Sequence, residues 1–361
     1  MIGRRVRARD ASFAVEASFP LELGGALEQV RVAYRTWGRL APDGANAVVV
    51  CHALTGSADA AEWWSPLFGA GRALDPARDF VVCANVLGSC LGTTGPASPR
   101  PGGGVYGPDF PPITVRDLVR LQALLLAALG VTRVRLVLGG SLGGMQALEW
   151  ALLFPDLVDA FAAIAAPARQ PSYALALDEV QRQTIAADPR WRGGRYAPND
   201  PPRAGLAAAR ALAVCSYRGR AEFEERFGLR RAASGEHDVG RYLRAHGERL
   251  ARRFDANAYV ALTRVCDAHD VGRGRGGVVA ALGALRAKAL VVAVDSDLLY
   301  PPEEPRALAA AIPGARFALL SSPRGHDAFL ADAAALDPLL VSFRAAVEDA
   351  APAALAAGGS R

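Results

Sequence analysis

Residues 134–154 read VRLVLGGSLGGMQALEWALLF, and this stretch decides the fold. The apolar run at 134–138 predicts a buried strand, and the glycine-rich turn after it leads into an apolar helix that ends before Pro155. The turn contains the pattern G-x-S-x-G around Ser141. A strand that passes through this pattern into a helix is typical of a nucleophile elbow. The alternative is a glycine-rich connection without chemistry, and the strand and helix on either side favour the elbow.

Steric crowding accounts for the glycines of this turn. Where a strand turns at once into a helix, Ser141 is forced into a strained backbone conformation, and side chains at positions 139 and 143 would collide. Both positions are glycine. The serine hydroxyl then stands at the start of a helix, where backbone N–H groups and the helix dipole favour developing negative charge. We therefore predict that Ser141 is a catalytic nucleophile.

Further apolar runs resemble the strand before Ser141. They are residues 47–51, 80–84 and 290–294. Their continuous hydrophobicity predicts strands buried on both faces of a parallel sheet, and residues 115–129 between them have helical periodicity. Strands and helices that alternate in this way predict an α/β class protein with a doubly wound, mostly parallel sheet, and the elbow makes this the α/β-hydrolase fold. We expect residues 19–34, with a turn at Gly24-Gly25, to form a hairpin at a sheet edge.

The middle of the chain lacks the strand pattern. Residues 167–285 contain amphipathic, arginine-rich helical stretches separated by breaks rich in proline and glycine. We expect an insertion that forms a helical cap over the strand ends, where open α/β sheets bind ligands. The predicted organisation is an α/β core of residues 1–166 and 286–346, a cap of residues 167–285, and a flexible tail of residues 347–361.

The composition limits the classes of partner. Of the 361 residues, 51% are hydrophobic and 21% are charged, as in a packed globular protein. The net charge of +5 comes from arginines that are scattered and accompany no binding motif, so we expect no nucleic-acid partner. The five cysteines are odd in number and form no CxxC pair, which favours a reducing compartment. With no signal-peptide pattern and no apolar run long enough to span a bilayer, we expect a cytoplasmic protein without a membrane partner.

His326 is the best candidate for a general base. A serine hydroxyl is a weak nucleophile that needs a base, which is in turn oriented by a carboxylate, and on this fold the chain order is Ser, acid, His. Of the five histidines, His52 precedes Ser141 and three lie in the helical insertion, whereas His326 follows a predicted strand at 316–320. Order and position therefore favour the base over a surface loop histidine.

Two aspartates compete for the role of the acid. Asp295 and Asp297 both follow the predicted strand at 290–294, and spacing alone does not decide between them. The oxyanion hole needs two N–H groups aimed at the developing charge. One is expected from Leu142, the residue after the nucleophile, and the other from the loop at 52–56 after an early strand.

Several motifs resemble the homoserine O-acetyltransferase family. The most specific are GGSLGGMQALEW at 139–150 and GHDAFL at 325–330. The others are CHALTG at 51–56, NVLG at 85–88, GTTGP at 92–96, DFP at 109–111, DVG at 270–272 and DLLYPP at 297–302. The resemblance runs from about residue 19 to residue 343 and so covers most of the chain.

The resemblance implies a Ser-His-Asp acyltransferase of methionine biosynthesis. Its triad acid falls on Asp297, and its oxyanion-hole donors fall on Leu54 and Leu142. The implied reaction is a ping-pong transfer in which acetyl-CoA acylates Ser141 and L-homoserine then takes the acyl group. Acetyl-CoA is a co-substrate here, and no bound cofactor or metal is expected. The resemblance also implies a homodimer built through the cap.

Substrate-binding residues are implied in the same way. An arginine that grips the homoserine carboxylate falls on Arg210, a tyrosine beside it falls on Tyr217, and an aspartate that holds the ammonium group falls on Asp327. An amino-acid substrate does need one cation and one anion held away from the reacting hydroxyl. The alternatives are that Arg210 is an ordinary helix-surface arginine and that Asp327 only pairs with Arg324.

Other functions remain open at this point. Ser89 and Leu142 stand where the family often has glycine and methionine, and the stretch between residues 60 and 63 is shorter than in many relatives. These departures leave a succinyl donor as an alternative on the same scaffold, and the sequence does not decide between homoserine and serine as the acceptor. An esterase or thioesterase would use the same triad without Arg210 and Asp327. A binding or scaffold protein that has lost the chemistry is disfavoured by the intact Ser-Asp-His set.

Overall fold

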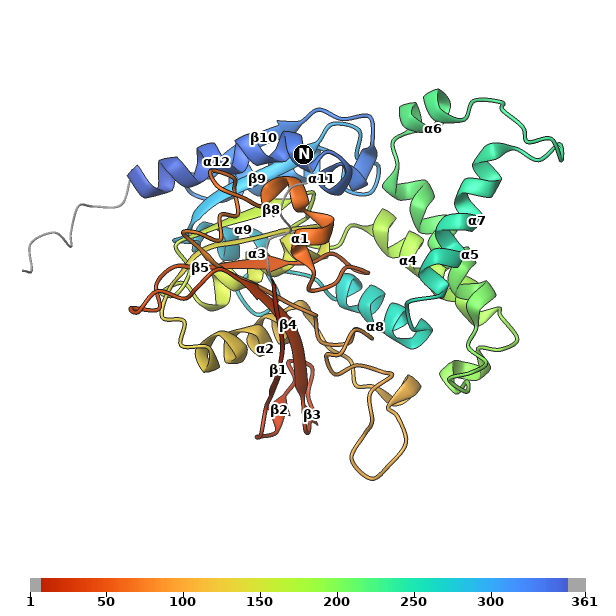
Figure 1. Ribbon diagram of the computed structural model, residues 1–361, viewed down its shortest axis with the longest axis horizontal. Coiled ribbons are helices and arrows are strands. Elements are labelled where there is room, and N and C mark those ends of the chain that lie inside the picture. The colour runs from red at the N-terminus through yellow and green to blue at the C-terminus, as the bar shows by residue number, and fades with distance from the viewer. Residues whose placement is uncertain (1–7, 350–361) are drawn as a thin grey trace, which may run out of the picture.

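The computed structural model describes residues 8–349, which form a twisted central sheet with helices on both faces and a further group of helices to one side (Figure 1). The sheet has eight strands in the spatial order β1-β4-β6-β5-β7-β8-β9-β10. Their bounds are β1 Arg9–Ala14, β4 Arg31–Trp37, β5 Ala47–Cys51, β6 Phe80–Ala84, β7 Val134–Gly140, β8 Ala160–Ile164, β9 Lys288–Val294 and β10 Arg316–Leu320. Neighbouring strands from β6 to β10 are parallel, and β4 is antiparallel to both β1 and β6. The predicted mostly parallel α/β sheet is confirmed.

The central strands are buried on both faces. In β5, Val49 and Cys51 point into one hydrophobic layer, and Val48 and Val50 point into the other. The first layer is covered by α2 Val115–Ala128, α3 Leu142–Leu153, α9 Val278–Gly283 and α10 Glu303–Ala311. The second layer is covered by α1 Ala60–Trp63, α11 Ala328–Ala331 and α12 Ala333–Asp349. Burial on both sides explains why these strands are continuous apolar runs in the sequence.

The predicted edge hairpin over residues 19–34 is partly wrong. The glycine turn exists, because Gly24 and Gly25 have φ angles of 97° and 77°. The short strands β2 (Phe19–Pro20) and β3 (Ala26–Leu27) pair across it as a separate two-stranded sheet. The chain then enters the main sheet as β4, whose outer neighbour at the edge is β1. The apolar pattern does not reveal β1 because nearly all of its residues are exposed.

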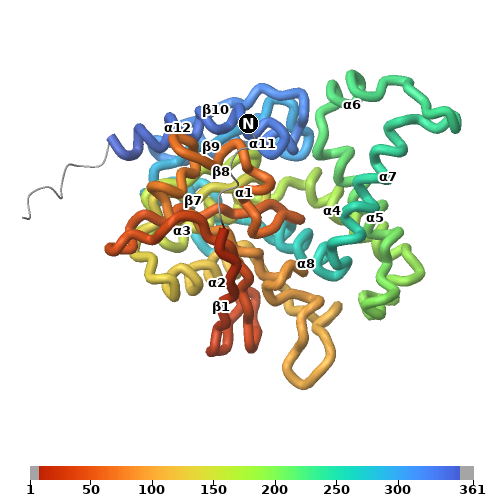
Figure 2. Tube along the Cα trace, in the orientation of Figure 1, coloured from red at the N-terminus to blue at the C-terminus, as the bar shows by residue number. Residues whose placement is uncertain are grey.

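Between β8 and β9 the chain leaves the sheet and forms the helices on the right of Figures 1 and 2. They are α4 Ser172–Ala186, α5 Arg203–Tyr217, α6 Arg220–Arg226, α7 Asp238–Ala251 and α8 Ala256–Asp267. Helix α5 packs against α4 and α7, and it also contacts the short turn Gly325–Asp327 that follows β10. At the other end of the chain, α12 continues to Asp349, and the rest of the predicted tail lies outside the described residues.

Candidate active site

Ser141 lies where β7 ends and α3 begins, and its backbone is strained. Its φ of 59° and ψ of −124° fall in a region that residues other than glycine seldom occupy. A Cβ atom at Gly139 would lie 2.5 Å from the backbone of Gly143, and one at Gly143 would lie 2.1 Å from the Cys51 carbonyl oxygen. The predicted steric need for both glycines is therefore confirmed, and the turn presents Ser141 to a cavity at the strand ends.

His326 and Asp297 form a buried hydrogen-bonded pair. His326 Nδ1 lies 2.7 Å from Asp297 Oδ2, and the two side chains are 3% and 0% exposed. Burial disfavours the imidazolium, but the charge of Asp297, its hydrogen bond and the charge of Asp327 together outweigh burial and raise the pKa of His326 above its ordinary value. The other ring nitrogen, Nε2, is buried and has no hydrogen-bond partner among residues 8–349. It is therefore free to take a proton from a group in the cavity that His326 lines.

Hydrogen bonds show which of the two aspartates contacts His326, a choice that the spacing in the sequence left open. Asp297 Oδ2 contacts the imidazole, and its Oδ1 accepts the backbone N–H groups of Leu299 at 2.8 Å and Tyr300 at 3.0 Å. Asp295 Oδ2 instead accepts the Ser321 hydroxyl at 2.6 Å, and its Oδ1 accepts the Ser322 N–H at 3.0 Å. Asp295 thus joins the loops after β9 and β10, while Asp297 orients the histidine.

Among the backbone N–H groups near Ser141, those of Leu142 and Leu54 have no backbone partner within the described part of the chain. Leu142 is the first residue of α3, where an intrahelical acceptor is always missing. Leu54 lines the same cavity as Ser141. Both are the positions predicted for an oxyanion hole.

The cavity over Ser141 has a volume of about 660 Å³ and is lined from two sides. Leu54, Ser141 and His326 come from the loops at the strand ends, and Arg210 and Tyr217 come from α5. The Tyr217 ring lies 5.6 Å from the His326 ring, and the Arg210 guanidinium lies 5.3 Å from the Tyr217 ring centre. The structure thus brings Arg210 and Tyr217 to the predicted triad, although they are far from it in sequence.

Asp327 also lines this cavity, and its ion-pair partner differs from the one considered from sequence. Arg324 pairs with Asp332 at 3.0 Å and so leaves Asp327 free of it. Asp327 Oδ2 lies 3.4 Å from Nε of Arg218, the residue that directly follows α5. The carboxylate therefore faces both the cavity and the helices that lie between β8 and β9 in the chain.

Comparison with known proteins identifies the family. The family described as alpha/beta hydrolase fold matches residues 46–333. The homoserine O-acetyltransferase of Chloroherpeton thalassium is 51% identical over 325 residues, which cover 90% of this chain and 86% of that protein. The chain belongs to the homoserine O-acetyltransferase family. Family membership and the predicted α/β-hydrolase fold are thus both confirmed.

Solved structures place this family beside esterases. The homoserine O-acetyltransferase from Staphylococcus aureus is 30% identical with a TM-score of 0.76, and the similarity covers 93% of this chain and 95% of that one. Esterase E22 is 26% identical with a TM-score of 0.87, and the similarity covers 94% of this chain and 100% of that one. Homoserine O-acetyltransferases and esterases therefore share this fold, so the fold alone does not separate transfer from hydrolysis.

Sequence reasoning missed two arginines at the site of this homoserine O-acetyltransferase family member. Arg218 pairs with Asp327, as described above. Arg253, between α7 and α8, lines the cavity and donates a hydrogen bond from Nη1 to the Thr55 carbonyl oxygen at 3.0 Å. The sequence offered only a weak signal, because Arg252-Arg253 is one of several arginine pairs in an arginine-rich chain.

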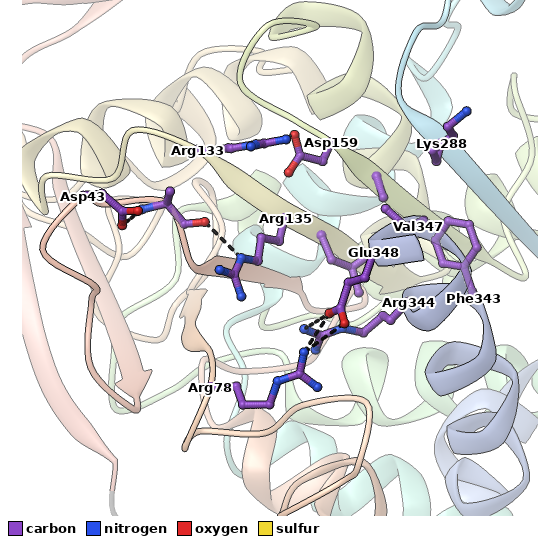
Figure 3. A pocket seen from close by; sticks show the side chains of 13 residues that line it. Asp43, Arg78, Arg133, Arg135, Asp159, Lys288, Phe343, Arg344, Val347 and Glu348 are labelled. Atoms are coloured by element: carbon purple, nitrogen blue, oxygen red, sulfur yellow. Dashed lines mark hydrogen bonds and ion pairs between the residues drawn. The ribbon is translucent and has the colours of Figure 1, made fainter. Parts of the chain in front are cut away.

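A second cavity, of about 640 Å³, lies at the opposite, amino-terminal ends of the central strands and lacks these features (Figure 3). Neither serine nor histidine lines it, and most of its arginines are already paired. These pairs are Arg78 with Glu348, Arg133 with Asp159 and Arg344 with Asp79. Within residues 8–349 no cluster of His, Cys, Asp and Glu could hold a metal ion, and no helix there is long and apolar enough to cross a membrane.

Proposed function

We propose that this chain is a homoserine O-acetyltransferase, which transfers the acetyl group of acetyl-CoA to the γ-hydroxyl of L-homoserine in methionine biosynthesis. The observation that carries the proposal is one cavity that combines Ser141 and His326 with the charged side chains of Arg210 and Asp327. An ester hydrolase needs only the first two, whereas a zwitterionic acceptor also needs a cation and an anion. The relatives that are about half identical to the chain carry the same name.

The first half-reaction acylates Ser141. His326 Nε2 takes the hydroxyl proton while Oγ attacks the thioester carbonyl, and the N–H groups of Leu54 and Leu142 hold the oxyanion. The intermediate collapses by breaking the carbon–sulfur bond, and the leaving thiolate takes the proton from His326. Asp297 keeps the ring oriented and stabilises its charged form during both proton transfers.

The second half-reaction transfers the acetyl group to the acceptor. Arg210 binds the homoserine carboxylate beside Tyr217, and Asp327 binds the ammonium group, which leaves the γ-hydroxyl free to reach the acyl carbon. His326 takes the hydroxyl proton, the new ester bond forms, and Ser141 leaves with that proton restored. Arg218 shares the Asp327 carboxylate and so limits where the ammonium group can bind.

Water competes with homoserine for the acyl group, and we propose that residues 167–285 act as the cap that excludes it. Helix α5 of this segment contributes Arg210 and Tyr217 to the cavity wall. A covered, dry pocket favours transfer over hydrolysis. The same proposal assigns residues 1–166 and 286–346 to the core.

The test is an assay of purified protein with acetyl-CoA and L-homoserine. We expect O-acetylhomoserine to accumulate with matching CoA release, and S141A to abolish both. Succinyl-CoA and L-serine are offered in turn as the alternative donor and acceptor. A faster reaction with either would overturn the corresponding half of the proposal.

An esterase or thioesterase is the second candidate, because esterase E22 shares this fold over almost the whole chain. That function predicts steady CoA release without any acceptor. Transfer predicts a single burst of CoA, equal to the enzyme concentration, until homoserine is added. Pre-steady-state measurement of CoA without homoserine therefore separates the two.

We also propose a homodimer through the cap and a cytoplasmic location. Leu229, in the connection between α6 and α7, is 87% exposed, so an apolar side chain of this segment is accessible to a second copy of the chain. The five free cysteines suit a reducing compartment. Sedimentation of L229E tests the interface, since a charge there should yield monomers if the cap forms it.

A further inference from the structure

His52 is a buried histidine that the proposed mechanism does not use. It directly follows β5, is 1% exposed, and opens the loop that carries Leu54. Burial lowers the pKa of its imidazole to about 4, against a smaller opposite effect of its hydrogen bond to Ala53. The ring is therefore neutral at physiological pH, and its two nitrogens have distinct roles.

The partners of His52 determine its tautomer. The backbone N–H of Val86 donates to Nε2 at 3.1 Å, so that nitrogen carries the lone pair. Nδ1 lies 2.8 Å from the Ala53 carbonyl oxygen, which can only accept, so Nδ1 carries the proton. Val86 follows β6, and the neighbouring strand thus sets which ring nitrogen donates to the loop.

The Ala53 carbonyl belongs to the peptide group whose N–H is that of Leu54. It accepts a second hydrogen bond from the Gly56 N–H at 2.9 Å, so two donors hold it. Because a trans peptide is planar, fixing the carbonyl on one side fixes the Leu54 N–H on the other. Donors to the carbonyl also polarise the peptide and strengthen its N–H as a donor.

A second buried group joins the two arms of the oxyanion hole. Gln146, on α3, donates from Nε2 to the carbonyl oxygens of His52 at 3.2 Å and Leu142 at 3.1 Å. Its own Oε1 accepts Gln122 Nε2 at 2.8 Å, and Gln122 in turn accepts Trp150 Nε1 at 2.8 Å. These side chains are all buried, so the chain of amides holds the His52 loop at a fixed place beside α3.

We propose that His52 is a positioning residue for acyl transfer, which through its Nδ1–H aims the Leu54 N–H at the oxyanion. The inference rests on the proposed function, since it needs Leu54 to be an oxyanion donor. It assigns His52 no contact with substrate and no proton transfer. Its contribution is the orientation of one peptide group in the transition state.

Two substitutions of His52 by amide side chains test the roles of Nδ1 and Nε2 one at a time. The short side chain of H52N reaches the position of Nδ1 and can still donate to the Ala53 carbonyl. The longer side chain of H52Q reaches the position of Nε2 and can accept from Val86, but leaves the Ala53 carbonyl without its side-chain donor. Losing an oxyanion donor lowers kcat by about 10²–10³-fold, so we expect misorientation in H52Q to lower it by about 10- to 100-fold and H52N to lose much less.

The measurements are the rate of the CoA burst, the homoserine KM, and the affinity for methylboronic acid, which forms a tetrahedral adduct on a nucleophilic serine. We expect H52Q to slow the burst and weaken boronate binding by similar factors, with the homoserine KM unchanged. Equal losses in H52N and H52Q, or boronate binding unchanged in H52Q, would overturn the inference. If H52Q does not fold, G56A tests the same geometry, because a Cβ there would lie 3.1 Å from His52 Nδ1.

The proposed function and the positioning role of His52 can be contradicted independently of each other. If the unaltered protein transfers no acetyl group to homoserine, the proposed function is wrong. The boronate affinities of the two variants still report on the oxyanion hole, because they need only Ser141 and its surroundings.

Discussion

His326 sets the pH dependence that we expect of the reaction. It acts as a base only while Nε2 is unprotonated, and its pKa is raised above the ordinary value of 6.5 because Asp297 together with Asp327 outweighs burial. Acylation should therefore slow as the pH falls through a pKa above that value. D297N removes the charge and leaves the wrong tautomer, so we expect kcat to fall about 10⁴-fold and the remaining acid limb to move to lower pH.

The CoA burst, followed from about pH 5 to pH 9, measures both effects. D295N is the matched control, because Asp295 binds Ser321 and Ser322 and does not contact the imidazole. An acid limb that stays in place in D297N would remove Asp297 from the triad. The same raised pKa stabilises the fold fully below the unfolded-state pKa of His326, and this contribution is lost as the pH rises through the folded-state pKa.

Arg210 should affect the acceptor and not the donor. R210A removes the cation proposed for the homoserine carboxylate, so we expect the homoserine KM to rise by about 10- to 100-fold while the CoA burst stays unchanged. R226A is a suitable control, because Arg226 is also a cap arginine stacked on an aromatic ring, that of Tyr242, but is 50% exposed. A normal KM in R210A would contradict the assignment.

At the site, local residues were predictable and distant ones were not. The elbow at Ser141 could be predicted because strand, turn and helix are consecutive in the sequence. The choice of Asp297 over Asp295 could not be predicted from spacing. It depends on the hydrogen bonds of Asp297 to His326 and of Asp295 to Ser321 and Ser322, which lie 26 residues or more away in the sequence. The family resemblance pointed to Asp297 where spacing had left the choice open.

At the scale of elements, the strands that were missed have physical reasons. Strand β8 reads AFAAI, and alanine is weak in both hydrophobicity and β propensity. Helix α3 packs closely on this strand, since a Cβ at Gly144 would lie 3.2 Å from the backbone nitrogen of Ile164. The stronger runs of β5, β6, β7 and β9 were predicted because branched side chains fill both layers.

Helix α3, which carries the elbow at its start, is anchored by a buried carboxylate in its last turns. Glu149 is 1% exposed and accepts Arg116 at 3.1 Å and Arg275 at 3.0 and 2.8 Å. Removing one partner of a buried ion network leaves the others uncompensated, so we expect E149Q to destabilise the fold by about 3–5 kcal/mol. Urea unfolding measures this loss.

E179Q is the control for that change. Glu179 lies on α4, is 53% exposed and pairs with Arg182, so its loss should change stability far less than the loss of Glu149. Equal stability of E149Q and the unaltered protein would show that the network contributes nothing net. Activity measured well below the unfolding transition should be retained in E149Q, because Glu149 does not line the cavity.

At the scale of the whole molecule, the proposed cap meets the proposed core at the cavity over Ser141 and His326. The sequence predicted an insertion between two strands, but not where its helices would lie, because their position depends on single contacts across the boundary. Arg218 at the end of α5 pairs with Asp327 beside the base. Arg253 after α7 bonds to Thr55 beside the oxyanion arm. The contacts that place the proposed cap therefore also touch the loops that carry His326 and Leu54.

The Arg253 contact gives a test of how the cap excludes water. The Nη1 of Arg253 donates to the Thr55 carbonyl at 3.0 Å, so R253A removes a charged hydrogen bond between cap and loop. We expect acetyl-CoA hydrolysis without homoserine to rise by roughly 3- to 10-fold relative to transfer, since such a bond contributes about 1 kcal/mol. R252A is the neighbouring control, because Arg252 is 63% exposed and pairs with Glu248 on its own helix turn and not with the Thr55 loop. Unchanged hydrolysis with a raised homoserine KM would instead make Arg253 a second ligand for the substrate carboxylate, and water exclusion would then depend on other cap contacts.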